Sequence, residues 1–244
     1  MHARIAERIA DAAKLTSDSV VFEIGPGTGM LTRPLLERAK KVIAIEADQE
    51  LFEKLKNDFA NEISSKKLKL IHGDIRTYPL NTTTALNRGY QVVANIPYYL
   101  TGEIFRMFLE SENQPSSMTL LVQKEVAERI ARSTKESILS LSVKAYGTPK
   151  YEFTVPRGAF KPAPKVDSAV LTISGISRKN FHTKKKEEKF FTLIRAGFAH
   201  KRKFVRKNLL EVGLPSGDIP EKARAEDLHL SDWLELIRYN VQNA

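Results

Sequence analysis

A glycine-rich turn between two patterned segments constrains the fold of this chain more than any other stretch. The turn, Gly25-Pro-Gly-Thr-Gly29, follows a largely apolar run of strand length at 20–24. A helical pattern comes directly after it, with Leu31, Leu35 and Leu36 on one face. Glycine tolerates the left-handed backbone of a tight turn and lets a ligand approach the main chain. The sequence therefore predicts the strand, turn and helix that begin a nucleotide-binding βαβ unit.

An acid before the turn indicates which ligand this unit binds. The glycine spacing is G-x-G-x-G rather than the G-x-G-x-x-G of dinucleotide sites, and Glu23 stands two residues before the first glycine. A carboxylate there would repel a pyrophosphate, but it could hold the ammonium group of an amino-acid-like ligand. We therefore predict S-adenosylmethionine, bound by Glu23, Gly25, Gly27 and Gly29. For the glycines alone, a tight strand-to-helix turn in another α/β protein is the alternative.

Two more acids follow predicted strands. The stretch 41–46 predicts a buried strand ending in Glu46, 21 residues after Gly25, about the separation at which a Rossmann-type acid reaches a ribose. A third strand at 68–72 precedes Asp74 and Ile75, which we expect at the adenine edge of the ligand. Taken singly, an ordinary strand-end acid and an ordinary Gly-Asp turn are the alternatives.

The most specific motif is Asn95-Ile-Pro-Tyr98, which follows a fourth predicted strand at 91–94. Pro97 has no backbone N–H and restricts the residue before it, which fixes a non-helical turn at the end of the strand. Open α/β sheets place their chemistry at that end. The side-chain oxygen of Asn95 and the backbone carbonyl at Pro97 can converge on an amino group that must lose a proton. Tyr98 offers a stacking face for a base; a proline turn with a buried tyrosine is the alternative.

A second aromatic candidate lies in the basic, proline-rich loop 156–165. Phe160 is its one aromatic residue, and it could form a second stacking face opposite Tyr98. A loop anchored in the core by Phe160 is nearly as well supported by the sequence. We count Asn95, Pro97, Tyr98 and Phe160 as the predicted catalytic residues.

Hydrophobic periodicity predicts the other elements. We expect helices at 4–14, 48–60, 101–111, 123–134 and 228–241, one basic helix at 188–211, and strands at 118–122, 151–155 and 166–173, the last two forming a hairpin.

The charge of the chain is unevenly distributed. The net charge is +10 and the pI is near 9.6, which indicates a polyanionic partner such as nucleic acid or an anionic membrane face. A generally basic, solvated surface is the alternative. Residues 176–244 hold 15 lysines and arginines against 9 acids, so we predict a methyl-donor-binding domain at 1–175 and a basic, helical, RNA-binding domain at 176–244. The predicted RNA contacts are Arg195, Lys201, Arg202, Lys203, Arg206 and Lys207.

Several classes of protein are disfavoured by the composition. No apolar run reaches the length that a bilayer requires, and no signal-peptide pattern is present, so we expect a cytoplasmic protein with no membrane partner. The chain has no cysteine, which excludes disulfides and thiolate metal sites. We expect no metal, because no second histidine stands at metal spacing from His72.

Together these motifs resemble the ribosomal RNA adenine dimethyltransferases. The resemblance spans nearly the whole chain and rests on the stretches 22–32, 95–98, 158–169, 195–203 and 223–226. It implies an α/β fold, a Rossmann-like class I methyltransferase sheet of seven strands that uses S-adenosylmethionine, with a small helical C-terminal domain. It also implies dimethylation of N6 on two adjacent adenines near the 3′ end of small-subunit (16S) rRNA, a step in ribosome biogenesis. We expect a monomer that binds the small ribosomal subunit.

The resemblance also implies roles for single residues. Gly25 would lie against the methionine portion of the donor, Glu46 on its ribose and Asp74 on its adenine. Asn95 would lie between donor and target base, and Tyr98 would stack on that base.

Two departures from the family pattern bear on these roles. Family members usually carry a Gln-x-Phe-Leu stretch before the first helix, covering the methionine end of the donor, and this sequence shows none. The tetrad continues as Tyr99-Leu-Thr101, where the ribosome-assembly branch usually has Asn-Ile-Ser/Thr. Relatives that methylate large-subunit RNA and confer antibiotic resistance share the tetrad. Methylation of large-subunit RNA is therefore one alternative function. A non-catalytic RNA-binding assembly factor is another.

Overall fold

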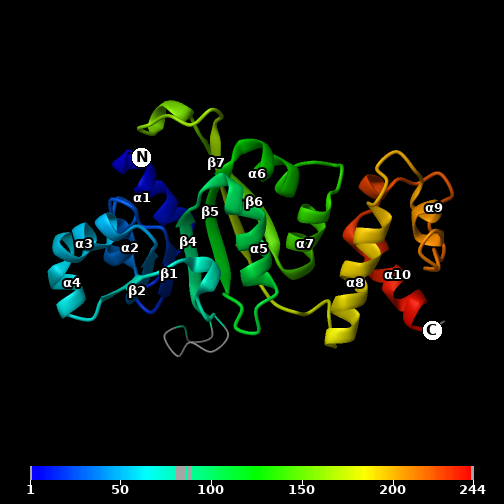
Figure 1. Ribbon diagram of the computed structural model, residues 1–244, viewed down its shortest axis with the longest axis horizontal. Coiled ribbons are helices and arrows are strands. Elements are labelled where there is room, and N and C mark those ends of the chain that lie inside the picture. Colours follow the sequence, from blue (N-terminus) through cyan, green and yellow to red (C-terminus); the bar gives the residue numbers. More distant parts are fainter. Residues whose placement is uncertain (1, 81–85, 87–88, 243–244) are drawn as a thin grey trace. The chain divides into compact units, whose positions relative to one another are not determined.

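One seven-stranded sheet forms the centre of the first part of the chain. The computed structural model describes residues 2–80, 86 and 89–242, and its strand order is β3-β2-β1-β4-β5-β7-β6 (Figure 1). The strands are β1 (Val20–Ile24), β2 (Lys41–Glu46), β3 (Leu68–His72), β4 (Gln91–Asn95), β5 (Ser117–Gln123), β6 (Thr148–Val155) and β7 (Ser168–Ser174). The first five strands are parallel to one another, and β7 is antiparallel to β5. The predicted α/β sheet of seven strands is confirmed.

The central strands are apolar because both faces of the sheet are covered. From Val21 to Ile24 every residue of β1 is buried, and β2 is buried from Val42 to Glu46. Parallel strands covered on both faces read as continuous apolar runs rather than as alternating patterns. For this reason the sequence showed these strands clearly.

Helices with capping residues connect the strands. They are α1 (Ala3–Ala12), α2 (Thr32–Arg38), α3 (Gln49–Asp58), α4 (Ala60–Ser64), α5 (Thr101–Leu109), α6 (Lys124–Ala131), α7 (Ile138–Tyr146), α8 (Lys184–Gly197), α9 (Val205–Leu210) and α10 (Leu230–Gln242). Asp48 begins α3 by accepting the Leu51 N–H at 2.9 Å, and Ser137 and Ser140 form a capping box at the start of α7. The expected helix at 48–60 is divided into α3 and α4 at Phe59.

The chain forms two compact units. One comprises Met1–Ala127 and Pro149–Ile176 and contains the sheet; the other comprises Glu128–Thr148 and Ser177–Ala244 and is helical. The segment 128–148 joins the helical unit through side-chain contacts. For example, Asn180 Nδ2 donates to the Ala145 carbonyl at 2.7 Å, and the Tyr146 ring stacks on Phe191 with centroids 6.2 Å apart. The second unit thus includes a segment that lies well before the change of composition at residue 175.

The prediction of one basic helix at 188–211 is wrong. The structure has two helices, α8 and α9, separated by a loop at 198–204. The buried side chain of Asn208 explains the break, because its Nδ2 donates to the Gly197 carbonyl at 2.6 Å and to the His200 carbonyl at 3.2 Å. These bonds satisfy carbonyls that a helix end leaves without partners.

Candidate functional site

The carboxyl ends of the parallel strands bring the predicted donor-binding residues to one edge of the sheet. In the strand register, Ile24 at the end of β1 lies opposite Ile45 of β2 and Ala94 of β4. Glu46 at the end of β2 lies opposite His72 of β3. The segments that follow these strands therefore start side by side, as open α/β sheets arrange their ligand sites.

The three glycines of the first turn have different surroundings. All three have positive φ, +62° at Gly25, +60° at Gly27 and +77° at Gly29. A Cβ added at Gly25 or Gly27 would meet no atom within 4 Å, whereas at Gly29 it would lie 2.5 Å from the Phe59 ring. Gly25 and Gly27 therefore offer main chain to an approaching ligand, and Gly29 serves the packing of the turn against α3.

Glu23 is a buried acid without a partner. Its exposed fraction is 1%, and neither carboxylate oxygen accepts a hydrogen bond from any described residue; the nearby Thr32 hydroxyl is equally without one. Burial raises the pKa of Glu23 to about 8; proximity to the Thr32 hydroxyl opposes this shift, and the charge of Glu46 adds to it. Buried polar groups are normally satisfied. An unpaired carboxylate beside the glycine turn fits the ammonium group of a bound amino-acid-like ligand.

Glu46 ties the glycine turn to the end of β2. The Gly27 N–H donates to its Oε2 at 2.9 Å, and the Asp48 N–H donates to its Oε1 at 3.0 Å. The side chain is nearly buried, with 6% of the residue exposed. Each carboxylate oxygen retains a further acceptor position, so Glu46 can accept from a ribose hydroxyl while it holds the turn.

Asp74 is already engaged by a neighbour. Its Oδ1 accepts the Arg76 N–H at 2.9 Å, and the Arg76 guanidinium Nε donates to both oxygens at 3.1 and 3.0 Å. This contact keeps the pKa of the Asp74 carboxyl below its usual value. Ile75 is buried and begins the 3-10 turn Ile75–Thr77. An adenine amine at Asp74 would have to share its carboxylate with Arg76.

The four predicted catalytic residues line one cavity. Its volume is about 280 Å³, and its lining consists of Asn95, Ile96, Pro97, Tyr98, Phe160, Pro162 and Pro164. Asn95 ends β4, and Tyr98 begins the 3-10 turn Tyr98–Leu100. Two segments, separated by 62 positions from Tyr98 to Phe160, thus place a polar side chain and two aromatic rings around a single space.

The backbone hydrogen bonds of the tetrad indicate which main-chain carbonyl could accept a hydrogen bond from an amino group beside Asn95. The Pro97 carbonyl accepts the Leu100 N–H at 3.0 Å, as the first bond of the 3-10 turn. Among the described residues, no backbone N–H outside the helices and strands donates to the Ile96 carbonyl. The main-chain carbonyl that remains available beside Asn95 as an acceptor is therefore that of Ile96. The sequence pointed to the Pro97 carbonyl instead, because the hydrogen bond that occupies this carbonyl is formed only in the folded turn.

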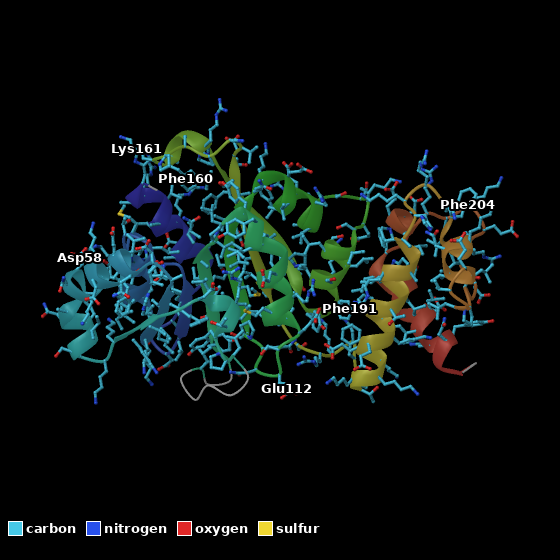
Figure 2. The ribbon with its side chains drawn as sticks, in the orientation of Figure 1. Asp58, Glu112, Phe160, Lys161, Phe191 and Phe204 are labelled. Atoms are coloured by element: carbon cyan, nitrogen blue, oxygen red, sulfur yellow. The ribbon has the colours of Figure 1, made fainter. Side chains whose placement is uncertain are left out.

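Phe160 lies both against the apolar core and in the wall of the cavity. It lies in the loop between β6 and β7, and Figure 2 shows it beside α1. The ring packs against the apolar cluster that includes Ala6 and Ile9 of α1, and it also lines the cavity. The His2 N–H donates to the Ala159 carbonyl at 3.2 Å, which holds this loop to the start of α1.

The predicted RNA contacts lie in the second unit, and they are not equivalent. Arg195 lies exposed in the last turn of α8, and Lys201 and Arg202 lie exposed in the loop 198–204. Lys207 is exposed on α9.

Two members of the basic set are engaged within the unit. Lys203 pairs with Glu211 at 2.6 Å, and Arg206 Nε donates to the Ile219 carbonyl at 2.6 Å. Of the six predicted contacts, Arg195, Lys201, Arg202 and Lys207 are therefore the exposed cations that are not engaged in this way. The sequence could not separate these groups, because the engaged cations Lys203 and Arg206 lie between exposed ones along the chain.

Within 2–80, 86 and 89–242, no cluster of histidine, aspartate and glutamate could hold a metal ion. In the same residues no helix combines the length and the apolar character that crossing a membrane demands.

Comparisons with known proteins agree with this geometry. The family model described as ribosomal RNA adenine dimethylase matches residues 2–240. The ribosomal RNA small subunit methyltransferase A of Fusobacterium nucleatum is 36% identical, with 96% of this chain and 91% of that protein covered. The protein of the same name from Dehalococcoides mccartyi is 37% identical, with 95% and 82% covered.

Solved structures extend the likeness to the fold. A dimethyladenosine transferase from Plasmodium falciparum aligns with a TM-score of 0.81 at 26% identity, covering 99% of this chain and 97% of that chain. The 23S rRNA methyltransferase ErmE aligns with a TM-score of 0.79 at 24% identity, covering 99% of both chains, and supports the fold alone. The chain therefore belongs to the ribosomal RNA adenine dimethylase family, and its sheet has the class I methyltransferase fold.

Proposed function

We propose that this protein dimethylates N6 of two adjacent adenines near the 3′ end of small-subunit rRNA, with S-adenosylmethionine as methyl donor. The observation that carries the proposal is the cavity formed by Asn95, Tyr98 and Phe160 at the edge of the sheet where the glycine turn and Glu46 lie. The curated relatives that cover most of the chain are named for the small subunit. This favours the small-subunit substrate over the large-subunit alternative, and the unpaired Glu23 favours an enzyme over a non-catalytic factor.

The donor fits the residues that are present. Glu23 would hold the ammonium group, the main chain at Gly25 and Gly27 would lie along the donor, and Glu46 would accept from the ribose. When bound, S-adenosylmethionine supplies an electrophilic methyl group on a sulfonium. The protein then has only to place the adenine amine in line with that methyl group.

The cavity residues perform this placement. The lone pair of an adenine N6 is delocalised into the ring, so the amine is a poor nucleophile. Acceptors at the Asn95 side chain and the Ile96 carbonyl would bind both N6 hydrogens and turn the lone pair out of the ring plane. Tyr98 and Phe160 would hold the base after it leaves its stack. In the placed geometry the N6–methyl bond would form as the sulfur–methyl bond broke, and the surplus N6 proton would leave to solvent. Positioning of this kind supplies much of the rate.

The exposed cations of the second unit support RNA binding. Lys201, Arg202, Arg195 and Lys207 would contact phosphates, which gives affinity that depends on salt and little on sequence. We infer a monomer that acts on the small ribosomal subunit in the cytoplasm, where this substrate is made.

The test is methyl transfer to ribosomal subunits. Labelled S-adenosylmethionine is incubated with small subunits that lack the modification and, separately, with large subunits, and the nucleosides are then analysed. We expect N6,N6-dimethyladenosine in small-subunit RNA alone. Label only in large-subunit RNA, or in neither RNA, would contradict the proposal.

A variant pair tests the role of Asn95. Asn95→Ala should abolish transfer while donor binding, measured by calorimetry, remains detectable. Asn57→Ala, which changes an exposed asparagine of α3, is the matched control and should keep full activity. Transfer at the control rate by Asn95→Ala would remove Asn95 from the mechanism.

A further inference from the structure

The antiparallel strand β7 brings its first residue to the functional edge of the sheet. Ser168 lies opposite Gln123, the last residue of β5, while Leu121 of β5 lies opposite Asn95 of β4. Because β7 is antiparallel to β5, it begins where the parallel strands end. Ser168 therefore lies at the same edge as the tetrad, 70 residues away in sequence from Tyr98.

Ser168 is fully buried and bonded to the ring that lines the cavity. Its exposed fraction is 0%, and its hydroxyl lies 2.7 Å from the phenolic oxygen of Tyr98, either oxygen being able to donate. A buried hydroxyl whose partner is removed bears the cost of desolvation. The pair therefore favours one position of the Tyr98 ring over others.

The backbone before Ser168 is itself fixed at two points. The Asp167 carboxylate accepts the Arg157 N–H at 2.9 Å, and the Asp167 carbonyl accepts the Lys124 N–H at 3.0 Å. Arg157 begins the 3-10 turn that leads into the loop of Phe160. Ser168 is thus a rigid support, held by the same segment that carries the second aromatic wall of the cavity.

We propose that Ser168 is a positioning residue for the target base, acting through Tyr98. A swing of the Tyr98 side chain about χ1 would carry its phenolic oxygen away from Ser168 and tilt the ring. The hydrogen bond therefore holds the Tyr98 ring in one position in the wall of the cavity that Phe160 also lines. This inference rests on the proposed function, because it assumes that the cavity receives the base.

The kinetic test uses Ser168→Ala, Tyr98→Phe and the double variant. At saturating donor, each single change should lower kcat/KM for the RNA by about 3- to 10-fold, the range that one neutral hydrogen bond provides. Donor affinity should stay unchanged. The double variant should be no worse than the single ones, since both remove the same bond.

The matched control is Thr172→Val, which removes another hydroxyl from β7. The Thr172 hydroxyl has no hydrogen-bond partner among the described residues, so this variant should keep wild-type kinetics. A wild-type kcat/KM for Ser168→Ala would overturn the proposal. The proposal would also be overturned if Ser168→Ala lowered kcat/KM by the same factor in the Tyr98→Phe protein as in the wild type. Ser168 would then act without the Tyr98 hydroxyl.

A measurement without RNA separates this inference from the proposed function. In protein labelled with 3-fluorotyrosine, the ¹⁹F resonance of Tyr98 is assigned by its absence in Tyr98→Phe. It should shift in Ser168→Ala and stay in place in Thr172→Val. An unshifted resonance overturns the inference, whether or not rRNA is methylated. Failure of the wild-type protein to methylate any rRNA, with the shift present, overturns the proposed function and leaves only the support of the Tyr98 ring by Ser168 established.

Discussion

Replacing Glu23 by glutamine should make the stability of the protein less dependent on pH. The folded structure buries this carboxyl without a partner and raises its pKa from the ordinary 4.5 to about 8. Between these two values the unfolded chain has released the proton and the folded chain still holds it. The contribution of Glu23 to the free energy of unfolding is therefore fully present below pH 4.5 and is lost as pH rises toward about 8. Above that pH it changes no further.

The magnitude follows from the two pKa values. Each pH unit between them changes the free energy of unfolding by about 1.4 kcal/mol. The whole interval from 4.5 to about 8 corresponds to a loss of about 5 kcal/mol at most. Glutamine has almost the same shape and no titration, so Glu23→Gln should equal the wild type near pH 4.5 and exceed its stability increasingly up to pH 8.

Urea unfolding at several pH values, followed by far-ultraviolet circular dichroism, measures this difference. The single tryptophan, Trp233, lies in the second unit, and the unfolding transition reported by its fluorescence serves as the internal reference. Other titrating groups are common to both proteins and cancel in the comparison. A stability difference that stays constant from about pH 5 to about pH 9 would refute a raised pKa at Glu23.

Donor binding provides a second readout of the same group. An ammonium beside Glu23 favours its charged form, so binding near pH 7 should release a proton from it. Calorimetry in buffers of different ionisation enthalpy should detect this proton in the wild type and not in Glu23→Gln. Equal proton release by both proteins would remove Glu23 from contact with the donor.

Two other predictions concern packing and RNA. Gly29→Ala should destabilise the first unit by about 1–3 kcal/mol in thermal unfolding, because the new Cβ would lie 2.5 Å from the Phe59 ring at a φ of +77°. Changing Lys201 and Arg202 together to alanine should weaken rRNA binding and lower the slope of log affinity against log salt by up to about 2, as measured by filter binding at several salt concentrations.

Each of these predictions has a control in the same chain. Gly102→Ala changes a glycine of α5 with open space around it, and it should leave thermal stability unchanged or raised. Lys184 and Lys185 are exposed at the start of α8, and changing both to alanine should affect RNA binding less than the change at 201 and 202. Equal stability of the two glycine variants, or equal salt slopes of the two lysine-region variants, would contradict the reasoning.

The sequence by itself determined the sheet and the positions of its functional residues along the chain. Runs such as 20–24 and 41–46 are apolar because their strands are covered on both faces, and this signal is local. Proline and glycine fix local backbone in the same way, so the turn at Gly25 and the tetrad at Asn95 could be recognised without knowledge of their surroundings.

Only the tertiary structure decided what those residues contact. The break between α8 and α9 depends on Asn208, which caps Gly197 from 11 residues away, and no period in the sequence encodes that bond. The pairing of Arg206 with a carbonyl, the unpaired state of Glu23 and the bond from Ser168 to Tyr98 arise in the same way. Hydrogen bonding and desolvation depend on which groups meet in space, and that is settled only when the strands have taken their order in the sheet and the helices have packed.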